Sequence, residues 1–371
     1  MAIDQHGDAA LQGVSIRSLP KVSLHDHLDG GVRPQTIIEL ADEIDLDVPE
    51  EDADDLADWF AEKSDSGSLV EYLKTFDLTT AVMQTREGLT RVAREFVEDL
   101  VADGVVYGEV RWAPEQHLAR GLSLEEAVEA VQEGIEQGED AADRRDRDIR
   151  VGQLITAMRH TDRSLEIAKL AVAYRDRGAV GFDIAGPEDG FPPSKHRAAF
   201  DYLASEFFPA TVHAGEAAGL DSIRGALIDG RALRLGHGVR LAEDLEVVSR
   251  SGEEVLVEFG DLARWVRDRE IPLELSPSSN LQTGAIAAWG TTLEDHPFDL
   301  LYQLGFSVTV NVDNRTMSRT SLTRELALLA ETFDYDLDDL EVFQLNAAAG
   351  AFLPVEEREE LIAIIGDGFD R

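Results

Sequence analysis

Eight short runs of apolar and β-branched residues recur along this chain, and longer segments with helical periodicity separate them. Strands that alternate with helices are typical of parallel βα units, and eight such units close into a barrel. An open, doubly wound sheet would show the same alternation, but no glycine-rich phosphate-binding turn follows the first run. The sequence therefore predicts an α/β fold, a (β/α)8 TIM barrel that occupies residues 1–371 as a single domain. The predicted strands are 22–27, 105–111, 151–157, 181–184, 210–213, 233–235, 272–275 and 307–312.

The segment between the first two predicted strands is longer than a simple crossover requires. It holds an acidic stretch, 48–55, and then residues 69–76, which have the periodicity of an amphipathic helix. Segments that follow barrel strands lie on the catalytic face. We therefore expect residues 37–85 to form a helical insertion after strand one, which either acts as a lid or only adds surface helices.

The net charge of this chain is unusual, because 74 acidic residues face 34 basic ones, which gives −40. Such a surface repels phosphates, which excludes a nucleic-acid partner and leaves a small-molecule substrate as the expectation. The charge is typical of adaptation to a high-salt cytoplasm. No apolar run is long enough to cross a membrane, and residues 1–13 lack a signal-peptide pattern, so we expect a cytoplasmic protein with no membrane partner. Without cysteine, the chain has no disulfide, thiolate metal ligand or cysteine nucleophile.

Four of the nine histidines stand at the ends of predicted strands. His25 and His27 end the first, His213 ends the fifth and His237 follows the sixth. The functional groups of a barrel gather at the carboxyl ends of its strands, and strand alternation directs His25 and His27 to one face. Two imidazoles placed in this way can share one cation.

Two carboxylates accompany these histidines. Glu216 follows His213 after one short turn, a position that suits a proton shuttle, although a carboxylate that caps a helix would look the same. Asp313 ends the eighth strand and can complete a His, His, His, Asp set that suits zinc. We interpret the polar residues at 276–280, after the seventh strand, as loop caps. The pattern predicts a metal-assisted hydrolase.

Six motifs follow one another along the chain as SLHDHLDG (23–30), GFDIAGPE (181–188), TVHAGEAAG (211–219), RLGHGVR (234–240), LSPSSN (275–280) and VNVDN (310–314). With these motifs in this order, the chain resembles the adenosine deaminase family of the metal-dependent amidohydrolases, and its bacterial members in particular. The resemblance implies a TIM barrel with one zinc ion per chain and the hydrolytic deamination of adenosine, and of 2'-deoxyadenosine, to inosine and ammonia in purine salvage.

The resemblance also implies a role for each site residue. Glu216 would be the proton shuttle at purine N1, and His237 would orient and help to deprotonate the zinc-bound water. Asp29 would hold the ribose hydroxyls, the backbone of Gly186 would contact the purine, and Asn314 would face N7, with His27 beside the substrate. The zinc ligands would be His25, His27, His213 and Asp313.

Two positions depart from the family's pattern. Asn314 stands where many members carry aspartate, and its amide can donate to N7 without first being protonated. Asp26 replaces a residue that is often apolar, and strand alternation directs it away from the metal. The fourth predicted strand contains no lysine that could bridge two ions, which favours a mononuclear site.

Two kinds of alternative function stay open. One is a deaminase of adenine or of a modified adenine nucleoside on the same scaffold, against which Asp29 and the helical insertion favour a nucleoside. The other is a non-catalytic nucleoside-binding protein, which the complete set of ligands and the presence of Glu216 disfavour.

Overall fold

The computed structural model describes residues 9–251 and 254–370, and within them eight parallel strands form two four-stranded sheets. One sheet has the order β3-β4-β5-β6, and the other has the order β12-β11-β8-β7. All eight predicted strands are present, and their ends differ from the prediction by at most two residues. They are β3 (Lys21–His27), β4 (Val105–Trp112), β5 (Arg150–Met158), β6 (Ala179–Ala185), β7 (Thr211–Ala214), β8 (Arg234–His237), β11 (Leu273–Leu275) and β12 (Val308–Val310).

The two sheets join at both edges and close the barrel. On one side the bridge pairs Asp26 with Asp313, where the Asp313 N–H donates to the His25 carbonyl at 3.0 Å and the His27 N–H donates to the Asp313 carbonyl at 2.8 Å. On the other side a bridge pairs Phe182 with Ala210. These contacts confirm the predicted TIM barrel. One of the two places where the barrel closes also contains predicted metal ligands.

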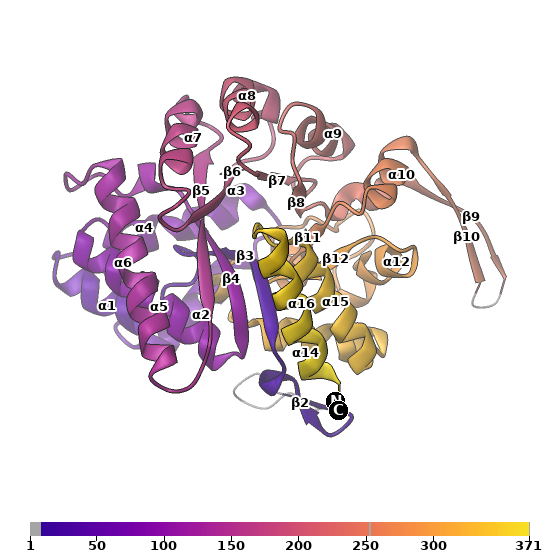
Figure 1. Ribbon diagram of the computed structural model, residues 1–371, viewed down its shortest axis with the longest axis horizontal. Helices are drawn as coiled ribbons and strands as arrows, with labels where there is room; N and C mark the ends of the chain where they lie inside the picture. The colour runs from indigo at the N-terminus through magenta and orange to yellow at the C-terminus, as the bar shows by residue number, and fades with distance from the viewer. Residues whose placement is uncertain (1–8, 252–253, 371) are drawn as a thin grey trace.

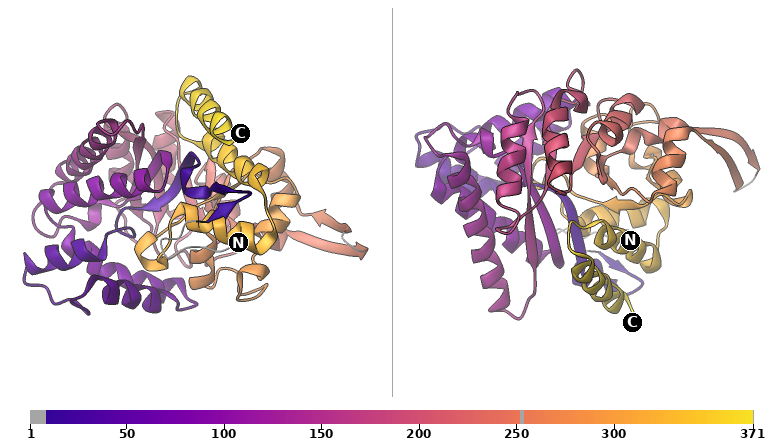
Figure 2. Two further views of the ribbon diagram at one scale, coloured as in Figure 1. Left: turned by 90° about the horizontal axis from the view of Figure 1, so that it is seen from below. Right: turned by 45° about the horizontal axis from the view of Figure 1, so that its top comes forward.

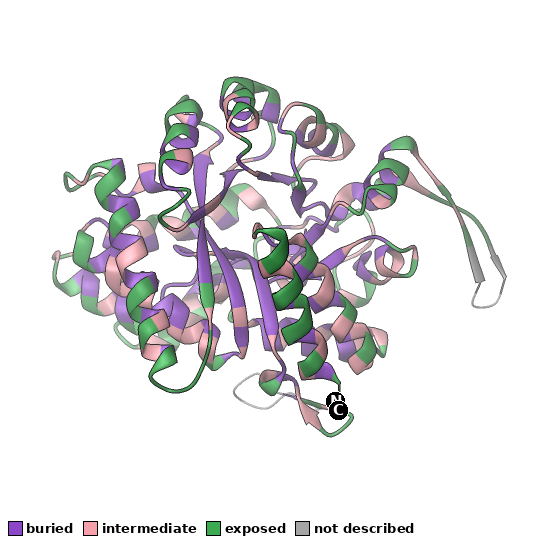
Figure 3. Cartoon of the chain, in the orientation of Figure 1, coloured by how far each residue is buried: buried purple, intermediate pink, exposed green. Residues whose placement is uncertain are grey.

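Amphipathic helices surround the strands (Figure 1), and Figure 3 shows that their inner faces are buried while their outer faces are exposed. Local sequence fixes where these helices begin; Ser123 and Glu126, for example, form a reciprocal capping box at the start of α6. Among the described residues, no helix combines the length and hydropathy needed to cross a bilayer. The outer helices are α5 (Arg86–Ala102), α6 (Leu124–Asp143), α7 (Ser164–Ala173), α8 (Arg197–Ser205), α9 (Leu220–Ile228), α10 (Asp261–Asp268), α12 (Phe298–Gln303), α14 (Leu322–Phe333), α15 (Leu337–Gly350) and α16 (Val355–Phe369).

The segment between β3 and β4 is helical, as predicted. Asp52 caps α2 by accepting the backbone N–H groups of Asp54 and Asp55. The Gly67 N–H donates to the Gln282 carbonyl at 2.8 Å, which ties the segment to the end of the short helix that follows β11. Its elements are α1 (Pro34–Asp42), α2 (Ala53–Ser64), α3 (Leu69–Tyr72), the 3-10 turn η2 (Leu73–Thr75) and α4 (Phe76–Val82).

An antiparallel ribbon, β9 (Leu245–Ser251) and β10 (Glu254–Phe259), follows β8, where the sequence analysis expected only a helix. In Figures 1 and 2 it extends away from the barrel in every view. Valine recurs in this stretch at positions 247, 248, 255 and 257, and β-branched residues favour strands, so a strand signal was present in the sequence. Val247, Val248 and Leu256 are exposed along the ribbon. A smaller ribbon, β1 (Ala10–Leu11) with β2 (Val14–Ser15), precedes the barrel.

Candidate active site

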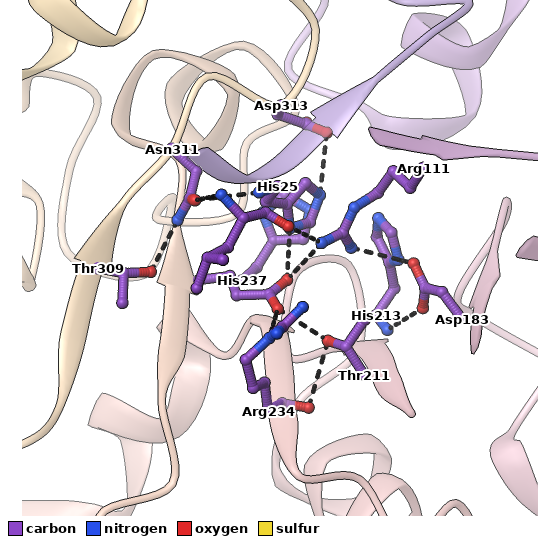
Figure 4. A network of polar contacts seen from close by, with 12 residues as sticks. His25, Arg111, Asp183, Thr211, His213, Arg234, His237, Thr309, Asn311 and Asp313 are labelled. Carbon is purple, nitrogen blue, oxygen red and sulfur yellow. Dashed lines mark hydrogen bonds and ion pairs between the residues drawn. The ribbon is translucent and has the colours of Figure 1, made fainter. Parts of the chain in front are cut away.

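The predicted histidines converge at the carboxyl ends of the strands, and Figure 4 shows three of them, His25, His213 and His237. The ring of His25 lies 4.7 Å, centre to centre, from each of the rings of His213 and His237, and the ring of His27 lies 5.2 Å from that of His213. Asp313, just beyond β12, points at this group, with Oδ1 3.2 Å from His25 Nε2 and 3.3 Å from His27 Nε2. Four strands thus bring together side chains that are up to 288 positions apart in the sequence.

These side chains form a compact set of donor atoms. One ligand-type atom from each of His25, His213, His237 and Asp313 lies within 4.8 Å of all the others. His27 belongs to the same place, because its Nε2 is 3.2 Å from His213 Nε2. Burial lowers the pKa of His27 and of His213, so that these two rings are neutral and can offer lone pairs to a cation. Burial also lowers the pKa of His237.

Two of these residues have a left-handed backbone, which is uncommon outside glycine. The φ angle is 63° at His237 and 59° at Asp313. Such a conformation costs a non-glycine residue about 1–2 kcal/mol, and the closed barrel maintains it at Asp313 through the two backbone hydrogen bonds to β3. The turn it produces at the strand end directs each side chain across the barrel mouth.

Buried carboxylates fix the orientation of two imidazoles. His25 Nδ1 donates to Glu274 Oε2 at 3.0 Å, and His213 Nδ1 lies 2.8 Å from Asp183 Oδ2. Both rings therefore carry their proton on Nδ1 and present the Nε2 lone pair to the centre of the group. His25 Nε2 is buried and faces Asp313 Oδ1 at 3.2 Å, an arrangement that suits two ligands of one metal ion.

Arginines hold these carboxylates in their charged form. Arg111 donates to Asp183 Oδ2 at 3.0 Å and to Glu274 Oε2 at 2.7 Å, and Arg234 donates to Glu274 Oε1 at 2.6 Å. Burial alone would raise the pKa of Glu274, but the two guanidinium groups hold it well below its usual range. The barrel interior beneath the histidines (Figure 4) is thus a network of paired charges that orients the ligands above it.

Glu216 and Glu188 are neighbouring carboxylates with opposite surroundings. Glu188 accepts the four backbone N–H groups of residues 215–218 at 2.6–3.1 Å and the Ser222 hydroxyl at 2.5 Å. Glu188, which the sequence analysis quoted in a motif but gave no role, is therefore the residue that satisfies the backbone donors of this loop. This leaves the Glu216 side chain free to face the histidines.

Glu216 is placed and protonated as a proton shuttle requires. Its Oε2 lies 3.6 Å from His237 Nε2, and its Oε1 is buried without a hydrogen-bond partner in the part of the chain that the structure describes. Burial raises the pKa of Glu216 well above its usual value, and the charges of Asp313 and Glu188 raise it further. A carboxylic acid at neutral pH can donate a proton to a substrate.

A cavity of about 450 Å³ opens beside the histidines and Glu216. All four residues predicted to contact a substrate line it. Asp29 is buried, which raises the pKa of its carboxyl group to about 7, and Oδ1 accepts no hydrogen bond from any described residue. The walls also include apolar side chains of the insertion after β3 and of the strand ends, among them Leu69, Tyr72, Phe76, Trp112 and Met158. Apolar walls with a few polar groups are typical of a site for a small organic ligand.

Glycine at position 30 makes room for Asn314. A Cβ atom at Gly30 would lie 1.9 Å from Asn314 Oδ1, so only glycine lets the amide occupy its place at the cavity. Asn314 Oδ1 is buried and lacks a hydrogen-bond partner among the described residues, as a group reserved for a ligand would be. Gly186 has a φ angle of 102°, which brings its backbone to the cavity wall.

Two further side chains near the site, Asp26 and Asn280, point in opposite directions relative to the histidines. Asp26 points away from the histidines, as strand alternation predicts, and its Oδ2 lies 3.1 Å from Arg315 Nε. The side chain of Asn280, which the sequence analysis interpreted as a loop cap, instead contacts His237 Nδ1 at 3.0 Å. That interpretation of Asn280 was wrong because the short helix α11 (Pro277–Gln282) turns the amide inward, toward β8.

Comparison with known proteins agrees with this geometry. The family model described as adenosine deaminase matches residues 20–367. Adenosine deaminase 1 of Streptomyces coelicolor is 57% identical over 353 residues, which are 95% of this chain and 86% of the relative. Adenosine deaminase of Mycobacteroides abscessus is 51% identical over 360 residues, which are 97% of this chain and 96% of the relative. Among solved structures, the N6-mAMP deaminase of Arabidopsis is similar, with a TM-score of 0.79, 28% identity, and coverage of 95% of this chain and 99% of that one.

Proposed function

This chain belongs to the adenosine deaminase family and deaminates adenosine by hydrolysis, and we propose that it does so with one zinc ion held by His25, His27, His213 and Asp313. The observation that carries the proposal is that His25, His27 and His213 meet Asp313 at the barrel mouth. Each of these imidazoles is either neutral or oriented by a buried carboxylate. Imidazole nitrogens with one carboxylate suit zinc. When bound, the ion supplies an activated water near neutral pH.

Glu216 would move the protons of the reaction. Adding a nucleophile to C6 of a purine disrupts the aromatic ring, and protonation of N1 makes that addition easier. The raised pKa of Glu216 keeps it protonated for this donation, and its burial excludes competing water. The carboxylate then accepts one proton of the attacking water and passes it to the amino nitrogen, which departs as ammonia. It next takes the proton of the new C6 hydroxyl, which gives the carbonyl of inosine and restores the protonated Glu216.

The cavity residues would position a nucleoside. The buried, unpaired Asp29 oxygen suits ribose hydroxyls, the Gly186 backbone suits the purine, and Asn314 suits N7. Among the residues that line the cavity, Lys74 is paired with Glu71 at 2.6 Å and Asp77 adds a negative charge, which is a poor setting for a 5'-phosphate. These features favour adenosine and 2'-deoxyadenosine over AMP.

We also propose that the helical insertion, residues 37–85, acts as a lid. Its elements α3, η2 and α4 supply Leu69, Tyr72, Leu73 and Phe76 to the cavity wall. Hydrogen exchange with and without the product inosine tests this. Slower exchange across α3–α4 is expected on binding, and unchanged exchange there would contradict a lid.

One assay tests the substrate and the metal together. Ammonia release is measured with adenosine, 2'-deoxyadenosine, adenine and AMP, in high salt, and the zinc content of the protein is determined. We expect release from the two nucleosides, about one zinc per chain, and loss of activity on chelation that zinc restores. Faster release from adenine would overturn the proposed substrate, and full activity in metal-free protein would overturn the metal.

A further inference from the structure

His237 is linked to a chain of hydrogen bonds that begins at a backbone N–H. The Phe298 N–H, at the start of α12, donates to His296 Nδ1 at 3.0 Å. His296 Nε2 lies 3.3 Å from Asn280 Oδ1, and Asn280 Nδ2 lies 3.0 Å from His237 Nδ1. All three side chains are buried. The far end of the chain, His237 Nε2, faces Glu216 Oε2 at 3.6 Å.

The direction of this chain is determined at its first link. A backbone N–H can only donate, so His296 Nδ1 must be the acceptor. Burial lowers the pKa of His296 to about 3, so the ring is neutral and its single proton is on Nε2. That N–H donates to the amide oxygen of Asn280, which leaves the amide N–H₂ facing His237. His237 Nδ1 is therefore an acceptor, and the proton of the neutral ring is on Nε2.

We infer that His296 and Asn280 are positioning residues that fix the proton of His237 on Nε2, so that His237 acts at the reaction site as a hydrogen-bond donor. The inference rests on the proposed location of the reaction beside Glu216 and His237. It changes the role that family resemblance implies for His237. A ring whose only lone pair is occupied by Asn280 has no free nitrogen with which to take a proton from water.

The consequence is that one group carries every proton. The Glu216 proton goes to purine N1, and the carboxylate takes a proton from the attacking water and gives it to the amino nitrogen as the C6–N bond breaks. The carboxylate then takes the remaining proton of the new C6 hydroxyl, which leaves a carbonyl in the product and Glu216 protonated again. The Nε2–H of His237 holds the oxygen of the nucleophile or the Glu216 carboxylate in place. Donor groups fixed in this way stabilise developing negative charge without reorganising.

The decisive measurement is the tautomer of His237 in the zinc-loaded enzyme. The protein is labelled with ¹⁵N-histidine, and the His237 signals are identified by their loss in His237→Gln. We expect a protonated Nε2 and a bare, hydrogen-bond-accepting Nδ1. A proton on Nδ1 of wild-type His237 would overturn the inference, whatever the activity of the enzyme, so this outcome is distinguishable from failure of the proposed function.

Variants then link the tautomer to the reaction. Asn280→Asp places an acceptor on both sides and should move the His237 proton to Nδ1, with kcat reduced by about 10²-fold and KM changed by less than about threefold. His296→Gln, whose amide can still donate to Asn280, should keep more activity than His296→Leu. The control is Tyr302→Phe, which removes a 2.7 Å bond to Asp339 from α12 but leaves the chain of hydrogen bonds intact. An Asn280→Asp enzyme with unchanged tautomer and kcat would also overturn the inference.

Discussion

The two halves of the barrel differ in the length of their strands. In the first half, β3 to β6 have seven to nine residues each, whereas β7, β8, β11 and β12 have three or four. The short-strand half supplies His213, Glu216, His237 and Asp313, and both left-handed residues of the site belong to it. The long-strand half supplies the His25 and His27 pair. Chemistry is therefore concentrated where regular pairing ends early and the backbone can turn side chains inward.

The largest expected effect is on the short-strand half, at Glu216. Glu216→Gln keeps the shape but removes the transferable proton, so kcat should fall by about 10²–10⁴-fold. The folded protein should not lose stability, because the substitution removes a buried ionisable group. Ammonia release and a urea titration measure the two quantities. A kcat within a few-fold of wild type would contradict the proposed shuttle.

The pH dependence of the activity tests the role of Glu216 in a second way. The raised pKa of Glu216 means that the active, protonated form is lost as pH rises through that pKa. We expect kcat/KM to decline on the alkaline side in wild type. The residual activity of Glu216→Gln should lack that decline. If kcat/KM of the variant falls at alkaline pH as it does in wild type, the decline belongs to another group.

A change at the junction of the halves should affect stability and metal binding together. Glu274→Gln, on β11, leaves Arg111 of β4 and Arg234 of β8 without their shared partner in a buried site. We expect a loss of about 3–5 kcal/mol in the free energy of unfolding. Zinc affinity should fall about 10–100-fold because His25 loses its orienting carboxylate. Chemical denaturation and zinc competition with a chelator measure these effects. Loss of stability with unchanged zinc affinity would show that Glu274 stabilises the fold but does not orient the zinc ligand His25.

A buried histidine of the long-strand half should make the protein sensitive to acid. His117, after β4, is fully buried, and burial lowers its pKa to about 4. The unfolded chain binds a proton below about pH 6.5, so folding stability contributed by the neutral ring is lost as pH falls from there toward 4. The loss should reach about 3 kcal/mol. The free energy of unfolding of His117→Gln should decline less steeply between pH 7 and 4.5 than that of wild type. An equally steep decline would show that His117 is not the cause of the acid sensitivity.

The smallest effect per residue is expected at the surface, outside both halves. The net charge of −40 repels itself in dilute buffer, and the Debye length falls from about 10 Å at 0.1 M salt to about 3 Å at 1 M. The midpoint of thermal unfolding should rise over that range. Measurements in NaCl and KCl check this, and a midpoint that does not rise would remove the argument for adaptation to high salt.

Periodicity was sufficient to predict the barrel, because each buried parallel strand is a short apolar run that ends at a recognisable turn. It also placed the histidines and Asp313, since strand ends of one barrel must meet. The roles of Glu188 and Asn280 were not predictable in the same way. Each depends on where a loop folds back, and a motif gives the type of a loop residue but not its partner. The ribbon β9–β10 was missed because a helix was expected after every strand, although both of its strands are rich in valine.

The tight fit between Gly30 and Asn314 has an evolutionary consequence. Any side chain at position 30 would displace the amide at 314, since the gap to a new Cβ atom is only 1.9 Å. These positions lie almost at opposite ends of the gene, yet position 30 can gain a side chain only if residue 314 changes as well. Attempts to retune substrate selection at 314 by stepwise mutation will therefore depend on glycine at 30, and a library that varies both codons together is the way to explore other bases.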